Sequence, residues 1–121
     1  MEHIATLGDI HLRESDGVMA LSITQAHVNM HAMAHGGLLA TLADCALGST
    51  VAGQLRTSVV TVQMSLEYMN AVRVGDWLEA HVQIDKPGKR LIYAGCVLKV
   101  GARVMLRASA VFAVRAASGP V

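Results

Sequence analysis

The stretch from Gly17 to Leu55 contains a single charged side chain, the carboxylate of Asp44. Apolar side chains recur around it at the spacing of an α-helix: Leu38, Leu39, Leu42, Ala43 and Ala46. We predict a helix from about Gly37 to Ala52, with Gly53 as its C-terminal stop. A carboxylate among such residues loses hydration, at a free-energy cost that a partner must compensate. Asp44 is therefore a candidate functional residue, and the alternative is a structural carboxylate that caps or bridges at the rim of an interface.

The segments on both sides of this helix have the patterns of β-strands. Before it, Ile10–Glu14 and Val18–Ile23 flank a Ser15-Asp16-Gly17 turn, which predicts a hairpin. After it come four strands. The first begins at Thr57, and the other three span Asp76–Ile84, Leu91–Val100 and Val104–Arg115. Leu91–Val100 is apolar on both faces, which predicts a central strand. The segments 29–35, 87–89 and 101–102 are expected to be loops and turns, and 116–121 a loose tail.

The strand that begins at Thr57 alternates in polarity. Its apolar face is predicted to hold Val60, Val62, Met64, Leu66 and Tyr68, and its polar face Thr61, Gln63, Ser65 and Glu67. One long helix between two blocks of antiparallel strands is an α+β pattern. The natural packing is a curved sheet wrapped around one long central helix.

Length, composition and charge restrict the possible functions. A chain of 121 residues that is 53% hydrophobic is expected to form one folded domain, residues 1–121. A net charge of +1 gives no electrostatic footprint for nucleic acid. Polar residues and Gly48 interrupt the apolar stretches, so we expect no membrane span. The first residues, 1–4, lack the features of a secretory signal, so we expect a cytoplasmic protein in which Cys45 and Cys96 are reduced thiols.

The residues around Asp44 form a spaced motif. Asn29 lies six residues before His35-Gly36-Gly37, and Asp44 follows nine residues after His35. Further on come Val60-Thr61-Val62, an Ala71-to-Asp76 segment and a Gly88-Lys89-Arg90 turn. Together these residues resemble the hotdog-fold acyl-CoA thioesterases, of the phenylacetate-degradation and 4-hydroxybenzoyl-CoA type. The resemblance covers about residues 8–115, and it implies a hotdog fold and hydrolysis of an acyl-CoA.

The resemblance also implies roles for individual residues. Asp44 would be the base or nucleophile, and the Gly36 N–H would donate to the developing oxyanion. Asn29 would orient the water or the thioester, His35 would shape the turn, and Thr61 would help to hold the water. Gly37 lies beside these groups at the start of the helix, where free N–H groups point outward. The resemblance implies neither a cofactor nor a metal.

Three other side-chain sets are alternatives to consider. His27, His31 and His35 would align as metal ligands if their segment were a helix, but its lack of periodicity predicts a loop. Cys45 adjoins Asp44, yet a small buried filler is the better interpretation. Four cations are candidates for the phosphates of coenzyme A, or else an ordinary polar surface. They are Lys89 and Arg90, together with Lys86 and Arg56.

The spacing along the helix predicts an active site shared between subunits. Gly37 and Asp44 are seven residues apart, which places them on one face but about 10 Å apart along the axis. A reacting carbon must lie about 3 Å from both the oxyanion donors and the catalytic group. Two antiparallel copies of the helix would meet this condition, and one copy would not. We therefore expect a homo-oligomer, and the resemblance implies a dimer or a tetramer with acyl-CoA as its substrate.

Two other functions remain open from the sequence. A hotdog protein that only binds an acyl thioester, as a sensor or a carrier-protein partner, would retain the fold without the catalytic aspartate's function. A hotdog dehydratase or hydratase would use a histidine with an acid, whereas here the acid follows His35-Gly36-Gly37 at thioesterase spacing. The sequence does not identify the acyl group.

Overall fold

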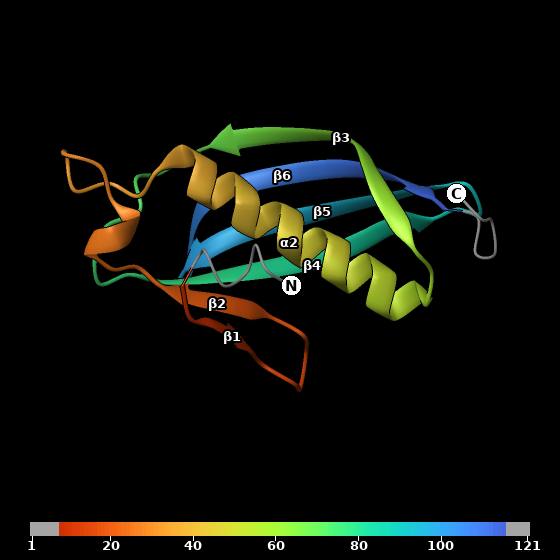
Figure 1. Ribbon diagram of the computed structural model, residues 1–121, viewed down its shortest axis with the longest axis horizontal. Coiled ribbons are helices and arrows are strands. Elements are labelled where there is room, and N and C mark those ends of the chain that lie inside the picture. Colours follow the sequence, from red (N-terminus) through yellow and green to blue (C-terminus); the bar gives the residue numbers. More distant parts are fainter. Residues whose placement is uncertain (1–7, 116–121) are drawn as a thin grey trace.

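The computed structural model describes residues 8–115, and the predicted tail at 116–121 lies outside the described residues. One 20-residue helix, α2 (Gly36–Leu55), lies across one face of a sheet (Figure 1). This confirms the predicted central helix. Its predicted end at Gly53 is wrong, because the helix continues for two more residues. The chain leaves the helix at Arg56, which adopts the left-handed conformation with φ of 52° and donates its N–H to the Ala52 carbonyl.

The sheet has six antiparallel strands in the order β1-β2-β4-β5-β6-β3. The strands are β1 (Ile10–Leu12), β2 (Met19–Ser22), β3 (Val59–Tyr68), β4 (Trp77–Pro87), β5 (Leu91–Val100) and β6 (Arg103–Val114). A short 3₁₀ helix, η1 (Gln25–His27), precedes the loop that leads into α2. The predicted central strand is confirmed, since β5 lies between β4 and β6. The first hairpin is shorter than predicted, with Gly17 at a φ of 74° in its turn.

The core lies between α2 and the sheet. The helix contributes seven buried side chains, those of Leu39, Leu42, Ala43, Cys45, Ala46, Leu47 and Val51. Facing them are alternate residues of the central strands, among them Leu78, Ile92, Leu98, Leu106 and Phe112. By length and apolar composition alone α2 would qualify as a membrane span. Its contacts with the sheet, rather than the polar interruptions in its sequence, assign it to the core.

A β-bulge in β3 changes which side chains face the helix. Thr61 pairs with Phe112 and Gln63 with Val111, so Val62 is the extra residue in the ladder. Beyond the bulge, Met64 pairs with the buried Ala110. The predicted alternation is therefore wrong before the bulge. Val60 and Val62 are about half exposed, whereas the Thr61 hydroxyl points toward α2, where it contacts Asp44.

Candidate active site

Asp44 lies on the partly exposed face of α2, opposite the start of β3. The Thr61 hydroxyl donates a hydrogen bond to Asp44 Oδ1 at 3.2 Å. Both residues line a cleft of about 370 Å³, whose other walls include Gly48, Ser58 and Phe112. The bulge at Val62 makes this contact possible, because without it Thr61 would not face the helix. The carboxylate is half-buried, partnered and open to the cleft, which suits a group that acts on a ligand.

Asn29 organises the loop before the helix. Its side-chain oxygen accepts hydrogen bonds from the backbone N–H groups of His31, at 2.9 Å, and Met33, at 3.3 Å. Within this loop Ala32 has a φ of 60°, a conformation that residues other than glycine rarely adopt. The side-chain oxygen is thus committed to the loop. The amide NH₂ is the part of Asn29 that can donate to a ligand.

Gly36 begins α2 in close contact with Tyr68 at the end of β3. The Tyr68 hydroxyl donates to the Gly36 carbonyl oxygen at 2.9 Å. A Cβ at Gly36 would lie 3.4 Å from the tyrosine ring, which is van der Waals contact. The Gly36 N–H belongs to the first turn of the helix, where N–H groups have no acceptor within the helix. It can therefore donate to a developing oxyanion.

The predicted site residues divide between two clefts of one chain. Asp44 and Thr61 line the first, and Asn29 and Gly36 line the second, which also measures about 370 Å³ and includes Tyr68. Gly36 and Asp44 are eight residues apart on a continuous helix, or about 12 Å along its axis. The structure therefore brings the predicted residues together as two pairs, but it does not unite the pairs within one chain.

Two of the remaining predicted residues, His35 and Gly37, lie at the start of α2. His35 is the residue just before α2, and its backbone carbonyl accepts from Leu38 and Leu39 N–H, while its side chain is exposed. Gly37 is exposed, and its carbonyl accepts from the Thr41 hydroxyl at 2.8 Å. The other two, Lys89 and Arg90, are exposed in the loop between β4 and β5.

The positions of the histidines and of Cys45 bear on two alternative interpretations, a metal site and a cysteine nucleophile. His27 is buried at the end of η1, where its Nδ1 accepts from the Thr24 N–H at 2.9 Å, while His31 and His35 are exposed. Across residues 8–115 no three histidine, cysteine, aspartate or glutamate side chains are placed to hold a metal ion. Burial, and then the charge of Asp44, raises the pKa of the Cys45 thiol, which opposes formation of a nucleophilic thiolate.

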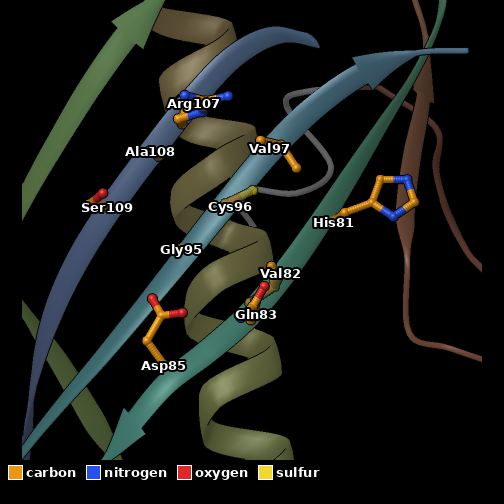
Figure 2. Close-up of a pocket in the computed structure, with 10 residues that line it drawn as sticks. All are labelled: His81, Val82, Gln83, Asp85, Gly95, Cys96, Val97, Arg107, Ala108 and Ser109. Atoms are coloured by element: carbon orange, nitrogen blue, oxygen red, sulfur yellow. The ribbon is translucent and has the colours of Figure 1, made fainter. Parts of the chain in front are cut away.

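Another cleft, of about 320 Å³, lies over Gly95 on the side of the sheet away from α2 (Figure 2). The Asp85 carboxylate points toward Gly95 from one end, and Arg107 and Ser109 lie toward the other (Figure 2). None of the predicted site residues lines it. The chemistry implied by the sequence therefore belongs to the helix side of the sheet.

Tyr68 is the site residue that the sequence reasoning missed. The alternation of β3 places it only on the apolar face of the strand, whereas its hydroxyl reaches the Gly36 carbonyl. The two residues are separated by 32 positions, so local periodicity could not pair them. The available signal was an aromatic hydroxyl at the end of an amphipathic strand, which is weak evidence for any one partner.

Comparisons with known proteins identify the family and the fold of the chain. The model of the thioesterase superfamily matches residues 31–105. The Pseudomonas aeruginosa protein PA0474, named as a candidate esterase, is 44% identical over 97 residues, which make up 78% of this chain and 72% of that protein. A structure of the Bacillus halodurans protein BH2602 with CoA is 28% identical, with a TM-score of 0.83. The match covers 93% of this chain and 76% of that one.

A third comparison concerns the fold alone. The PaaI protein from the Escherichia coli phenylacetic acid degradation operon superposes with a TM-score of 0.87 at 21% identity. The match covers 98% of this chain and 87% of PaaI. The sequence comparisons and the fold comparison thus point to the same family. The chain belongs to the thioesterase superfamily, has the hotdog fold, and is a thioester hydrolase.

Proposed function

We propose that this protein hydrolyses an acyl-CoA to a free acid and coenzyme A. The observation that carries the proposal is the hydrogen bond between Thr61 and Asp44, at the wall of an open cleft. It places a carboxylate with a fixed orientation where a thioester can reach it. The CoA in the related Bacillus halodurans structure supports coenzyme A as the thiol part of the substrate.

The chemistry requires a group that activates or replaces water. Acting as a base, Asp44 takes a proton from water, and the water oxygen forms a bond to the thioester carbon while Thr61 steadies the site. The carbon–sulfur bond then breaks, and the thiolate leaves with its electron pair and takes up a proton. Acting as a nucleophile, the Asp44 carboxylate itself bonds to the thioester carbon, and the carbon–sulfur bond breaks as the thiolate leaves with its electron pair and takes up a proton. Water then hydrolyses the resulting mixed anhydride, which releases the free acid and restores the Asp44 carboxylate.

The Gly36 N–H supplies the complementary electrostatic function. Charge develops on the carbonyl oxygen as the thioester carbon becomes tetrahedral, and a fixed N–H donor at a helix N-terminus stabilises that charge. The Tyr68 hydroxyl donates to the Gly36 carbonyl, which belongs to the next peptide group, and so links the start of the helix to the end of β3. Asn29 would direct its amide NH₂ to the same substrate, to orient the thioester or the water.

A complete site then requires two copies of the chain. β3 is an edge strand of the sheet, ten residues long, with Thr61 near its start and Tyr68 at its end. If two copies of β3 pair antiparallel about a two-fold axis through Ser65, with Val62 as the extra residue in each strand, Thr61 of one copy lies opposite Tyr68 of the other. This pairing would bring Asp44 of the first copy toward Gly36 of the second.

The exposed surface of β3 supports the same association. Val60 is 49% exposed and Val62 is 54% exposed, although both are apolar and β-branched. A long edge strand with unpaired backbone groups and apolar side chains is a site for pairing with another chain. The opposite edge, β1, has only three residues. We therefore propose a homodimer formed through β3, with two sites that each use both chains.

The cations of the β4–β5 loop are assigned to the phosphates of the substrate. Arg90 accepts a backbone hydrogen bond from Val114, and Arg115 donates one to Ser58, which lines the cleft of Asp44. This chain of contacts places the loop near the end of that cleft. Lys89 and Arg90 are exposed there and can pair with anionic phosphate groups.

A thiol-release assay tests the proposal. The purified protein is incubated with a panel of acyl-CoAs, from acetyl to phenylacetyl and longer acyl groups, with and without a chelator. We expect repeated turnovers with at least one member and no effect of the chelator. Tight binding of acyl-CoAs without thiol release would show a binding protein instead, and chelator-sensitive release would show metal-dependent chemistry.

A further inference from the structure

The segment that follows β3 contacts the start of α2 on both sides of the peptide group that carries the Gly36 N–H. On one side, the Tyr68 hydroxyl donates to the Gly36 carbonyl at 2.9 Å. On the other side, the Ala34 N–H donates to the Val72 carbonyl at 2.7 Å. The direction of the Gly36 N–H therefore depends on where the segment from Tyr68 to Val72 is held.

Asn70, in the middle of this segment, joins it to the start of β6. Its side-chain NH₂ donates to the Val104 carbonyl at 2.7 Å, and its side-chain oxygen accepts from the Arg103 guanidinium at 3.0 Å. Its backbone N–H donates to the Met105 carbonyl at 3.1 Å, and this carbonyl also accepts from the Met69 N–H at 2.9 Å. Asn70 is thus bonded to three consecutive residues of β6.

The orientation of the Asn70 amide is fixed by the chemistry of its two partners. A guanidinium only donates and a carbonyl only accepts, so each end of the amide has a partner of the opposite kind. The ladder between β3 and β6 ends at the pair of Tyr68 with Leu106, and beyond it the bonds of Asn70 continue the attachment to β6. The part-buried Asn70 amide is therefore suited to hold its own segment in place.

We propose that Asn70 is a positioning residue for the oxyanion donor at Gly36. Its bonds to β6 hold Tyr68 against the Gly36 carbonyl, and Val72 against the Ala34 N–H. The role rests on the proposed function, in which the Gly36 N–H stabilises charge on the thioester oxygen. Such a donor is most effective when its direction is already set before the reaction, because no reorganisation is then needed.

Two substitutions of Asn70 test this role. Asn70→Ala removes both side-chain bonds, whereas Asn70→Asp keeps an acceptor for Arg103 and removes only the donor to the Val104 carbonyl. We expect each to lower kcat by about 10-fold and to change KM by less than about twofold, because an oxyanion donor acts in the transition state. Hydrogen exchange of the Ala34 N–H should become faster in both variants, while the amides of β5 stay protected.

Val51→Ala is the matched control for a loss of stability alone. Val51 is fully buried near the other end of α2, so its truncation should lower Tm without loosening the start of the helix. We expect its kcat and the exchange of its Ala34 N–H to stay near wild type. A fall in kcat as large as that of Asn70→Ala, at the same loss of Tm, would show that Asn70 acts through stability alone and would overturn the proposal.

A double variant tests the route of the effect. Asn70→Ala combined with Tyr68→Phe should lower kcat by clearly less than the product of the two single effects, because both substitutions loosen one contact. Effects that multiply would overturn the proposal, as would an unchanged kcat in a folded Asn70→Ala protein. A wild-type protein that releases no thiol from any acyl-CoA would instead refute the proposed function. Unchanged exchange of the Ala34 N–H in Asn70→Ala would refute the positioning role whichever activity the protein has.

Discussion

The two clefts on the helix side of the sheet have the same size but contain different chemical groups. The first presents a carboxylate and a hydroxyl, from Asp44 and Thr61. The second presents N–H donors, from Asn29 and the first turn of the helix at Gly36, beside Tyr68. In the proposed mechanism, one cleft supplies the group that activates or replaces water, and the other supplies the groups that stabilise negative charge.

Under the proposed mechanism, each cleft is half of a site. A carboxylate without an oxyanion donor, or a donor without a base, provides only part of the catalysis. The rigid helix fixes the halves about 12 Å apart within one chain, so no small rearrangement can join them. In the proposed dimer, association of two copies would join each half to its complement. The predictions below test the two halves separately and then together.

The largest effect is expected in the first cleft, with Asp44→Asn. The amide has the same shape and can still accept from Thr61, but it neither takes a proton efficiently nor attacks the thioester. We expect kcat to fall by about 10²- to 10⁴-fold, as for loss of a general base. Circular dichroism and size-exclusion profiles should remain those of the wild type. A folded Asp44→Asn protein with near-normal turnover would remove Asp44 from the mechanism.

Asn29→Ala tests the second cleft. The substitution removes the amide NH₂ and also the oxygen that holds the N–H groups of His31 and Met33. We expect about a 100-fold loss of kcat/KM, comparable with loss of one oxyanion donor. Hydrogen exchange should increase in the loop 29–33 while β4 and β5 stay protected. Full activity together with a loosened loop would limit Asn29 to a structural role.

A smaller effect is expected for Tyr68, which joins the end of β3 to the start of α2 in the second cleft. Tyr68→Phe keeps the ring against Gly36 but removes the hydroxyl that donates to its carbonyl. Loss of one hydrogen bond of this kind costs about 1 kcal/mol, so kcat should fall by about tenfold or less. Stopped assays of thiol release measure this effect. A loss as large as that of Asp44→Asn would instead assign Tyr68 a direct part in the reaction.

The helix and the central strand could be predicted because their information is local. Apolar residues at helical spacing define α2, and an apolar run on both faces marks β5 as an interior strand. The motif likewise selected Asp44, Asn29 and Gly36 as candidates by their spacing, and their functional roles stay predictions. Their arrangement as two pairs followed from the helix rise, which is the same in any α-helix.

The features that the sequence did not reveal depend on non-local contacts. The bulge at Val62 arises from how β3 pairs with β6, and it turns Thr61 toward the helix against the simple alternation. The contact of Tyr68 with Gly36 joins distant segments. The helix ends at Arg56 instead of Gly53, because a residue in the left-handed conformation, rather than the presence of glycine, ends it.

The most direct test of the shared site is complementation between two inactive variants. Asn29→Ala and Asp44→Ala are purified as homodimers, each nearly inactive, and are then unfolded together and refolded as a mixture. In a heterodimer of the proposed symmetry, one site carries both lesions and the other carries neither. A random mixture contains about half heterodimers with one intact site of two, so about a quarter of wild-type activity should return. If heterodimers form, as shown by differential tagging, and the mixture stays inactive, each site lies within one chain and the shared-site account is wrong.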